Sequence, residues 1–470
     1  MLFNSIDYAI FLPIVFILYW LLPPKFRLVL LFISSYYFYM CWNAKYVFLI
    51  ATTTVVSYAC AIFIEKTADT KRKKAALLTA LFVSVGILFV FKYYNFTIAT
   101  IACVLPIKPV YLDFLLPVGI SFYTFQTLSY VADVYKGKIK AERNLIVYAT
   151  FVSFFPQLVA GPIERSANLL PQIKRENHFD YSVAWEGIIL ITWGLYKKLV
   201  IADNLAIWVD KVYGNVSHYQ GFSLLLATLF FTFQIYCDFS GYTDIARGSA
   251  KLLNIELMEN FRSPYFAIGF KDFWSRWHIS LSTWFRDYVY IPLGGNRVSK
   301  MRHAFNLLIT FLISGLWHGA NWTFVLWGGI HGVGLLCENY FVKRKNSLPR
   351  LFSVLVTFSL VMLAWVFFRS ANIQNAVYVF NHVFFGLTNL KLYFITGLKA
   401  LNIDFLTNVK IGIVYFLPLV IYDNLSIKIN IIKLLAEQSW GMRSAVIFFV
   451  TLLISIFGHV GQSSFVYFQF

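Results

Sequence analysis

The chain has 470 residues, of which 59% are hydrophobic and 19% aromatic, while only 13% are charged. Soluble domains carry about 25% charged residues, so a soluble globular protein is excluded and the lipid bilayer is the expected solvent. The net charge of +18, from 40 Lys and Arg against 22 Asp and Glu, is explained by the excess of basic residues that membrane proteins carry in cytoplasmic loops. We therefore expect no nucleic-acid partner.

Apolar runs follow one another along most of the chain. A spanning helix needs about 20 mostly apolar residues. The candidate runs are Tyr8–Leu22, Arg27–Trp42, Tyr46–Ile64, Ala75–Phe91, Leu115–Tyr135, Leu145–Pro162, Trp185–Val209, Phe222–Phe239, His303–Trp317, Trp322–Tyr340, Leu351–Phe368, Ile411–Tyr422 and Ser444–Gly458. Because several are short, the sequence predicts an all-α, polytopic integral membrane protein with about 10–12 transmembrane helices and additional re-entrant or interfacial helices.

The basic loops predict a topology. Lys25 and Arg27 lie between the first two runs, and Lys66 with residues 71–74 lies between the third and fourth. These two loops are on the same side if all four runs cross the membrane. The positive-inside rule makes that side cytoplasmic, so we expect an extracytoplasmic N-terminus.

Polar residues are unevenly distributed. We interpret residues 1–470 as a single membrane domain, in which plain hydrophobic helices at 1–115 and 341–470 flank a core at 116–340. The core mixes apolar runs with Gly, Pro, His, Arg and Asp. Ionisable groups at membrane depth are costly and collect around cavities or pathways, so the core is where we expect the functional site.

The segment 273–292 has a helical pattern. Asp272, just before it, and Arg276, within it, are at i,i+4 spacing and can pair. Ser282 and Arg286 form a second such pair. A continuous helix would place four side chains near one face: Trp274, His278, Ser282 and Arg286. An interfacial helix anchored by Trp and Arg is the alternative, but it explains His278 poorly, so we favour a functional face turned to the interior.

The segment 315–332 contains two histidines in an apolar, glycine-rich context. After Trp317 and His318 the pattern breaks one helix and starts another, with Asn321 as a candidate N-cap. The glycines permit close helix packing that would hold His318 inside the protein, where an imidazole is a functional candidate by default. His331 is equally well explained as a functional residue or as a hydrogen-bonding contact between helices.

The segment 236–247 places Asp238 and Asp244 close to Arg247. We favour an internal charge pair that holds helices together, because an acid and a base three residues apart can pair on one helix. Residues 154–165 contain two prolines and a glycine. Either this is a re-entrant loop or a span ends here with Glu164 and Arg165 in water.

Several common catalytic signatures are absent from the sequence. There is no G-x-S-x-G, P-loop, H-E-x-x-H or calcium-loop pattern, and the histidines lack acids or thiols at ligand spacing. We expect no metal and no tightly bound cofactor.

The polar segments together resemble the membrane-bound O-acyltransferase family, in particular its bacterial alginate O-acetyltransferase, peptidoglycan and teichoic-acid branch. The resemblance covers about residues 1–390. It is carried by LPVGISFYTFQ at 116–126, FPQLVAGPIER at 155–165, GLYKKLVIAD at 194–203, YCDFSGYTDIA at 236–246, FWSRWHISLSTWFRDYVYIPLGGNR at 273–297 and LWHGANWTFVLWGGIHG at 316–332.

The resemblance implies a helical bundle around a central tunnel and two active-site positions about forty residues apart. The later position is a histidine, here His318. The earlier position is His, Asn or Asp, here His278. His331 is a third candidate in the same block, while Arg276, Ser282, Trp317, Asn321 and Asp238 are the expected substrate-binding or supporting residues.

The expected activity is transfer of an acyl group, foremost acetyl, from a cytoplasmic thioester for O-acetylation of an extracytoplasmic polysaccharide or peptidoglycan, with His318 as general base. The donor would be acetyl-CoA or an acyl carrier protein. A secreted SGNH-type acetyltransferase is the expected partner, and the bacterial cytoplasmic membrane the expected location. The alternative within the family is D-alanyl transfer to teichoic acid from a carrier protein.

Two readings come from other classes. A transporter or flippase without chemistry also tolerates intramembrane charges and broken helices, although no inverted sequence repeat is seen. A scaffold for an envelope complex predicts that all three histidines are replaceable without loss of function.

Overall fold

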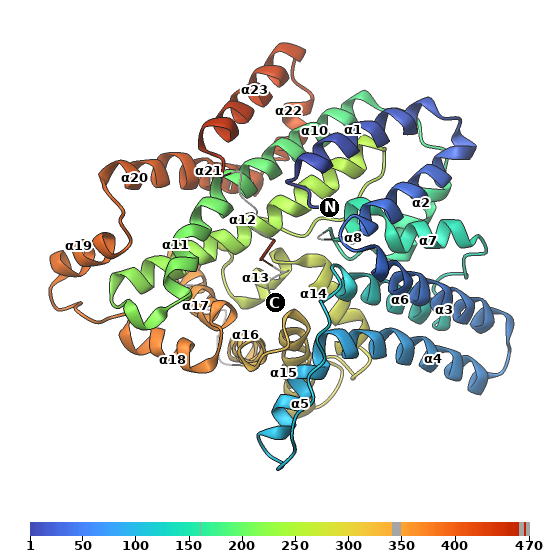
Figure 1. Cartoon of the computed structure of the whole chain (residues 1–470), viewed down its shortest axis with the longest axis horizontal. Helices are drawn as coiled ribbons and strands as arrows, with labels where there is room; N and C mark the ends of the chain where they lie inside the picture. The colour runs from blue at the N-terminus through green and yellow to red at the C-terminus, as the bar shows by residue number, and fades with distance from the viewer. Residues whose placement is uncertain (160, 341–348, 460–464, 467–470) are drawn as a thin grey trace. The chain divides into compact units, whose positions relative to one another are not determined.

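The computed structural model describes residues 1–159, 161–340, 349–459 and 465–466, and within them it is helical with no β-strand (Figure 1). This confirms the predicted all-α class. The described residues form two compact units. The first unit comprises Met1–Ile191 and Tyr242–Glu259, and the second comprises Thr192–Gly241 and the described part of Asn260–Phe470.

The first unit is built from short and long helices in chain order. They are α1 (Ile6–Leu21), α2 (Pro24–Met40), α3 (Val47–Lys66), α4 (Thr70–Leu88), α5 (Tyr94–Ala102), α6 (Ile120–Tyr135), α7 (Leu145–Ser153), α8 (Phe155–Leu158) and α9 (Ser166–Lys174). Helices α10 (Tyr181–Leu195) and α12 (Phe222–Leu252) contribute residues to both units.

The second unit carries the candidate site and the C-terminal helices. They are α11 (Asp203–Tyr213), α13 (Phe270–Arg276), α14 (Ile279–Phe285), α15 (Lys300–His318), α16 (Trp322–Tyr340), α17 (Arg350–Arg369), α18 (Ile373–His382), α19 (Leu390–Ala400), α20 (Phe405–Lys410), α21 (Leu417–Ser426), α22 (Ile431–Ala436) and α23 (Trp440–Phe457).

Six helical segments of the described residues are long and apolar enough to cross a membrane. They are Ala44–Lys66, Thr70–Ala102, Phe222–Leu252, Arg350–Arg369, Phe405–Ser426 and Trp440–Phe457. Two shorter apolar helices cover Ile6–Leu21 and Leu145–Leu158. The protein is therefore a multi-pass membrane protein, while the predicted total of about 10–12 spans and the predicted orientation stay predictions.

Helices α15 and α16 lie side by side (Figure 1), and their close packing depends on glycine. A Cβ on Gly315 would lie 2.2 Å from the carbonyl oxygen of Phe324, and a Cβ on Gly328 would lie 2.2 Å from that of Phe311. Any side chain at these positions would force the two backbones apart. The prediction that these small residues permit close helix approach is confirmed.

Between α7 and α9 the described residues 154–159 and 161–165 contain the short helix α8 and are otherwise non-helical. Glu164 is fully buried and accepts hydrogen bonds from the Met258 backbone N–H at 2.5 Å and from Asn168 Nδ2 at 2.8 Å. The alternative that places Glu164 in water is therefore wrong. The re-entrant loop stays a prediction.

Burial of Glu164, which lies outside the six candidate spans, predicts a pH-dependent stability. Burial raises the pKa of this carboxyl from 4.5 to about 7, against the opposing effect of its hydrogen bonds. The folded state therefore favours the protonated acid, and this contribution is complete below about pH 4.5 and is lost as pH rises through 7. Relative to Glu164→Gln, the wild type should lose about 3 kcal/mol of unfolding free energy between pH 5 and pH 8. Thermal unfolding of both proteins in detergent across this range measures the difference, and parallel pH profiles would contradict it.

Candidate active site

His278 occupies a break between two helices. Helix α13 ends at Arg276, α14 begins at Ile279, and His278 has φ +43° and ψ +54°, in the left-handed region. Residues other than glycine adopt this conformation infrequently, and it concentrates at functional sites. The prediction of one continuous helix through 273–292 is wrong, because the chain turns at this histidine.

The break changes the polar pairs expected along that helix. Arg276 Nε donates to Asp272 Oδ1 at 2.7 Å, so the predicted Asp272–Arg276 pair is confirmed. The predicted Ser282–Arg286 pair is wrong. Ser282 Oγ donates to the Trp277 carbonyl at 3.2 Å, and Arg286 Nε donates to Asp287 Oδ1 at 2.8 Å. Both Ser282 and Arg286 follow the turn, and a π-helix begins at Arg286 and ends at Tyr290. A π-helix has more residues per turn than the α-helix that the predicted i,i+4 pair assumed.

Asn260 holds the backbone that follows His278. The Ile279 N–H donates to the Asn260 carbonyl at 3.0 Å, and the Ser280 N–H donates to Asn260 Oδ1 at 3.2 Å. Asn260 and Ser280 are fully buried. These bonds satisfy two N–H groups at the start of α14 that have no partner within the helix. Asn260 is thus a positioning residue that the sequence interpretation missed, because the local sequence gives no sign of its distant partners.

His318 is the last residue of α15. Three residues separate it from α16, whose Thr323 N–H donates to Asn321 Oδ1 at 3.0 Å. Asn321 Nδ2 also donates to the Ala371 carbonyl at 3.0 Å. The predicted break and the predicted Asn321 cap are confirmed, and they place Asn321 in the support of the turn.

The structure brings His278 and His318 together. Their ring centroids are 6.3 Å apart, and the side chains are buried, with 0% and 3% of their surface exposed. Trp317 lies beside both, at 5.0 Å from His318 and 6.1 Å from His278. The two imidazoles are therefore near neighbours in one buried cluster.

His331 lies in an aromatic environment next to this pair. Its ring centroid is 4.8 Å from that of Trp327, 5.1 Å from Trp274 and 5.9 Å from the stacked ring of Phe273. Trp327 also packs edge-on against His318 at 5.0 Å. Among the described residues neither nitrogen of His331 has a hydrogen-bond partner. The alternative that His331 hydrogen-bonds a neighbouring helix finds no support in these contacts.

Because aromatic rings surround His331, we expect His331→Phe to fold normally and to retain acyl transfer. Core replacements that conserve volume usually cost less than about 1.5 kcal/mol. Unfolding midpoints and transfer rates of the purified variant measure both properties. A rate loss of about 10²-fold or more, the range of general acid–base catalysis, would instead make His331 a catalytic residue.

Asp238 belongs to a buried charge network. Lys198 Nζ lies 2.6 Å from Asp238 Oδ1 and 2.7 Å from Asp203 Oδ1, and all three side chains are at most 2% exposed. Lys197 Nζ donates to Ser240 Oγ at 2.9 Å. The sequence interpretation placed Asp238 near Arg247 and missed the lysine forty residues earlier. The predicted Asp244–Arg247 pair is present, with 3.9 Å between its charged atoms.

Helix α12 connects this network to the histidines. Phe239, the residue after Asp238, lies edge-on to the His278 ring with 4.6 Å between centroids. Phe239 also packs against Phe465 at 5.6 Å, and the Val466 N–H donates to Asp238 Oδ2 at 2.7 Å. Asp238 therefore holds helix α12 and residues 465–466 beside His278 through its contacts with Lys198 and Val466.

A pocket of about 570 Å³ adjoins the histidine cluster within the second unit. Its lining includes Trp274, which packs on His331, and Ile279, which follows His278. Ser314, one turn before His318 on α15, lines it as well, as do the predicted supporting residue Ser282 and its neighbour Arg286. The pocket thus combines an apolar wall with hydroxyl and guanidinium groups. Among the described residues, no group of three or more His, Cys, Asp and Glu is placed to hold a metal ion.

The described residues thus combine apolar helices long enough to cross a membrane with a buried pair of histidines. Comparisons with known proteins define the class of this protein. Residues 139–380 match the membrane-bound O-acyltransferase family. The chain is 40% identical over 413 residues to the probable alginate O-acetylase of Pseudomonas aeruginosa, covering 85% of this chain and 79% of the relative. It is 36% identical over 404 residues to the peptidoglycan O-acetyltransferase of Helicobacter pylori, covering 78% and 77%.

A more distant relative is the teichoic acid D-alanyltransferase of Bacillus subtilis, 30% identical over 280 residues, which cover 53% of this chain and 68% of the relative. The chain belongs to the membrane-bound O-acyltransferase family. It is an O-acyltransferase of the multi-pass membrane type.

Proposed function

We propose that this protein moves an acetyl group from a cytoplasmic thioester across the membrane for O-acetylation of an extracytoplasmic polysaccharide or peptidoglycan. The observation that carries the proposal is the close, buried pair of His278 and His318, 6.3 Å apart. The choice of acetyl over D-alanyl rests on the share of this chain that aligns with each kind of relative. The relatives named as alginate or peptidoglycan O-acetylating proteins align over 78–85% of this chain, whereas the D-alanyl relative aligns over 53%.

His318 is the proposed general base. As the acceptor oxygen attacks the thioester carbonyl, its proton passes to the neutral imidazole of His318, the C–O bond forms, and the C–S bond breaks to release the thiol. Such help is worth about 10²–10⁴-fold, and an imidazole is suited to it near neutral pH. The same geometry accommodates a carrier nucleophile in place of the final acceptor hydroxyl.

His278 is the proposed partner that orients the thioester carbonyl and stabilises the negative charge developing on its oxygen. Arg276, two residues earlier, is the alternative for this role. Its Nε–H is already directed at Asp272, and its side chain is 24% exposed. His278 is fully buried and faces His318, so the contacts favour the histidine.

The pocket of about 570 Å³ is the proposed chamber for the thioester arm of the donor. Its volume falls within the range of small-molecule sites, about 300–1,000 Å³. Ser282 and Arg286 supply polar groups for the amides or carbonyls of such an arm, while Trp274 and Leu281 supply apolar contact. Acetyl-CoA and an acylated carrier protein both present a thioester of this kind.

The proposed setting is the cytoplasmic membrane of a bacterium, with the N-terminus outside, as the basic loops at Lys25 and 71–74 predict. A separate SGNH-type acetyltransferase on the far side of the membrane would pass the acetyl group to the glycan. The alternative donor system, a D-alanyl carrier protein, is supported by the relative from Bacillus subtilis.

The test is thioester consumption by the purified protein in proteoliposomes. Acetyl-CoA carrying a labelled acetyl group is supplied on one face, and free thiol and labelled ester are measured together. Stoichiometric thiol release with label appearing on an acceptor or on the protein is the expected result. Movement of intact donor without thiol release would identify a transporter instead, and activity with only a D-alanyl carrier thioester would select the alternative substrate.

A further inference from the structure

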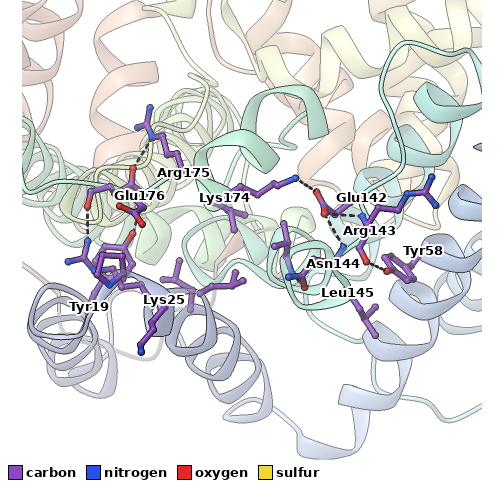
Figure 2. A pocket seen from close by; sticks show the side chains of 17 residues that line it. Tyr19, Lys25, Tyr58, Glu142, Arg143, Asn144, Leu145, Lys174, Arg175 and Glu176 are labelled. Atoms are coloured by element: carbon purple, nitrogen blue, oxygen red, sulfur yellow. Dashed lines mark hydrogen bonds and ion pairs between the residues drawn. The ribbon is translucent and has the colours of Figure 1, made fainter.

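The first unit contains a second pocket, of about 810 Å³, that shares no residue with the candidate active site. It lies among the end of α1, the start of α2, the loop before α7 and the end of α9 (Figure 2). Its charged lining residues are Lys25, Arg27, Arg143, Lys174 and Arg175, with Glu142 and Glu176. Five cations against two carboxylates leave an excess of three positive charges.

One end of this pocket is neutralised by internal contacts. Glu142 is buried and pairs with Lys174 Nζ at 3.0 Å, and it also accepts the N–H groups of Arg143 at 2.9 Å and Asn144 at 3.0 Å. Figure 2 shows Lys174 reaching toward Glu142. The Arg143 side chain pairs with Glu65 outside the lining. These groups have charged partners and offer little to a ligand.

The other end keeps its positive charge. Arg27 donates from Nη1 to the Asn177 carbonyl at 2.6 Å and from Nε to the Leu22 carbonyl at 3.1 Å. Arg175 donates from Nε to Asn177 Oδ1 at 2.8 Å and from Nη2 to the Asn254 carbonyl at 3.0 Å. All these acceptors are neutral oxygens. A guanidinium has five N–H donors, so each arginine is held in place and still has donors for an anion.

Two further features complete this cationic end. The guanidinium of Arg27 lies over the rings of Tyr19 and Trp20, at 5.2 Å and 4.9 Å from their centroids. Lys25 adds an exposed ammonium group, with its Nζ 5.0 Å from the Phe26 ring centroid. Glu176 is the one carboxylate lining this end, and it is exposed to solvent. This end of the pocket therefore carries three positive charges, from Arg27, Arg175 and Lys25, against one negative charge.

Exposed apolar side chains adjoin the same end. Leu21, Phe26 and Val29 are 76%, 49% and 40% exposed, and they lie on either side of Lys25 in the chain. In a multi-pass membrane protein such side chains contact lipid, whereas a soluble phosphate compound gains nothing from them. A ligand that uses both features has an anionic head and hydrocarbon chains.

We propose that this pocket is a binding site for an anionic phospholipid, with the phosphodiester headgroup held by Arg27 and Arg175 and the acyl chains lying along the exposed apolar residues of α1 and α2. Arginine pairs with phosphate oxygens through parallel N–H donors. Basic residues near a membrane surface favour anionic lipids in this way. The site is independent of the proposed acetyl transfer.

The test compares phospholipid retention by the full-length protein. Delipidated protein is mixed with phosphatidylglycerol or phosphatidylcholine in detergent, and bound lipid is counted by native mass spectrometry. The wild type should retain phosphatidylglycerol in preference, and Arg27→Gln/Arg175→Gln should lower that retention about tenfold or more. Lys71→Gln/Lys74→Gln is the matched control, because it removes two exposed positive charges outside the pocket and should retain lipid like the wild type.

Both arginines also donate to backbone carbonyls, so replacing them removes contacts within the protein as well. Lys25→Gln is therefore a second variant, since the contact of Lys25 is with the Phe26 ring. Its retention of phosphatidylglycerol should fall as well. Equal retention by wild type and both pocket variants would overturn the proposal, as would an equal loss in the control. A further arm adds coenzyme A or inorganic phosphate. Displacement of phosphatidylglycerol by coenzyme A at concentrations at which phosphate has no effect would assign the pocket to the acyl donor and overturn the lipid site.

Discussion

Replacement of His318 by alanine is expected to lower the rate of acyl transfer by about 10²–10⁴-fold, the range of general-base catalysis by a positioned side chain. The loss should appear in kcat, since the proposed general base accepts the proton that moves in the transition state. His278→Ala should also lower kcat, because it removes the proposed donor to the developing oxyanion. Label transfer in proteoliposomes measures both variants.

The matched control is His331→Phe, which changes a third buried histidine of the same cluster. It separates a catalytic role from general disturbance of the site, since His331 packs on Trp327 just as His318 does. Wild-type turnover by His318→Ala would end the assignment of this residue as the base. Equal loss in all three variants, together with lowered unfolding midpoints, would indicate that the cluster acts mainly through its structure.

Replacement of Lys198 by methionine is expected to destabilise the protein by about 3–5 kcal/mol, the cost of removing one partner from a buried ion pair. The substitution leaves Asp203 and Asp238 buried without their shared cation, and both carboxylates sit within 2.7 Å of the same nitrogen atom. Two like charges this close cannot both remain ionised cheaply. Unfolding titrations in detergent measure the loss.

Lys211→Met is the matched control for this prediction, because Lys211 is an exposed lysine of the same unit. It should change stability by less than about 1 kcal/mol. Adding Asp203→Asn and Asp238→Asn to Lys198→Met should recover much of the loss, since neutral replacement of a whole buried network is often nearly neutral in stability. A Lys198→Met protein as stable as the Lys211→Met control would refute the network's structural role.

Local patterns were enough to predict the features that depend on neighbouring residues. The end of α15 at His318, the cap at Asn321 and the Asp272–Arg276 pair all lie within one or two helical turns. Capping and i,i+4 pairing are properties of short segments. The all-helical class followed from composition, because lipid permits few other architectures.

The features that the sequence did not reveal depend on residues far apart in the chain. Lys198 meets Asp238 across forty positions, and Glu164 accepts a hydrogen bond from the backbone N–H of Met258, ninety-four positions later. Asn260 fixes the turn at His278 from eighteen positions earlier, through one carbonyl and one side-chain oxygen. Each contact forms only when the helices pack together. Local helix propensity and the periodicity of apolar residues therefore do not predict it.

The left-handed turn at residue 278 limits which amino acids can occupy that position without strain. The family resemblance admits His, Asn or Asp at this position, and besides glycine these are the residues most enriched at positive φ. Threonine can also donate and accept hydrogen bonds, but its β-branched side chain strains the backbone at positive φ. Such a residue would destabilise the turn. The small set of residue types that the resemblance implies for this position is therefore also the set that the backbone at φ +43° favours.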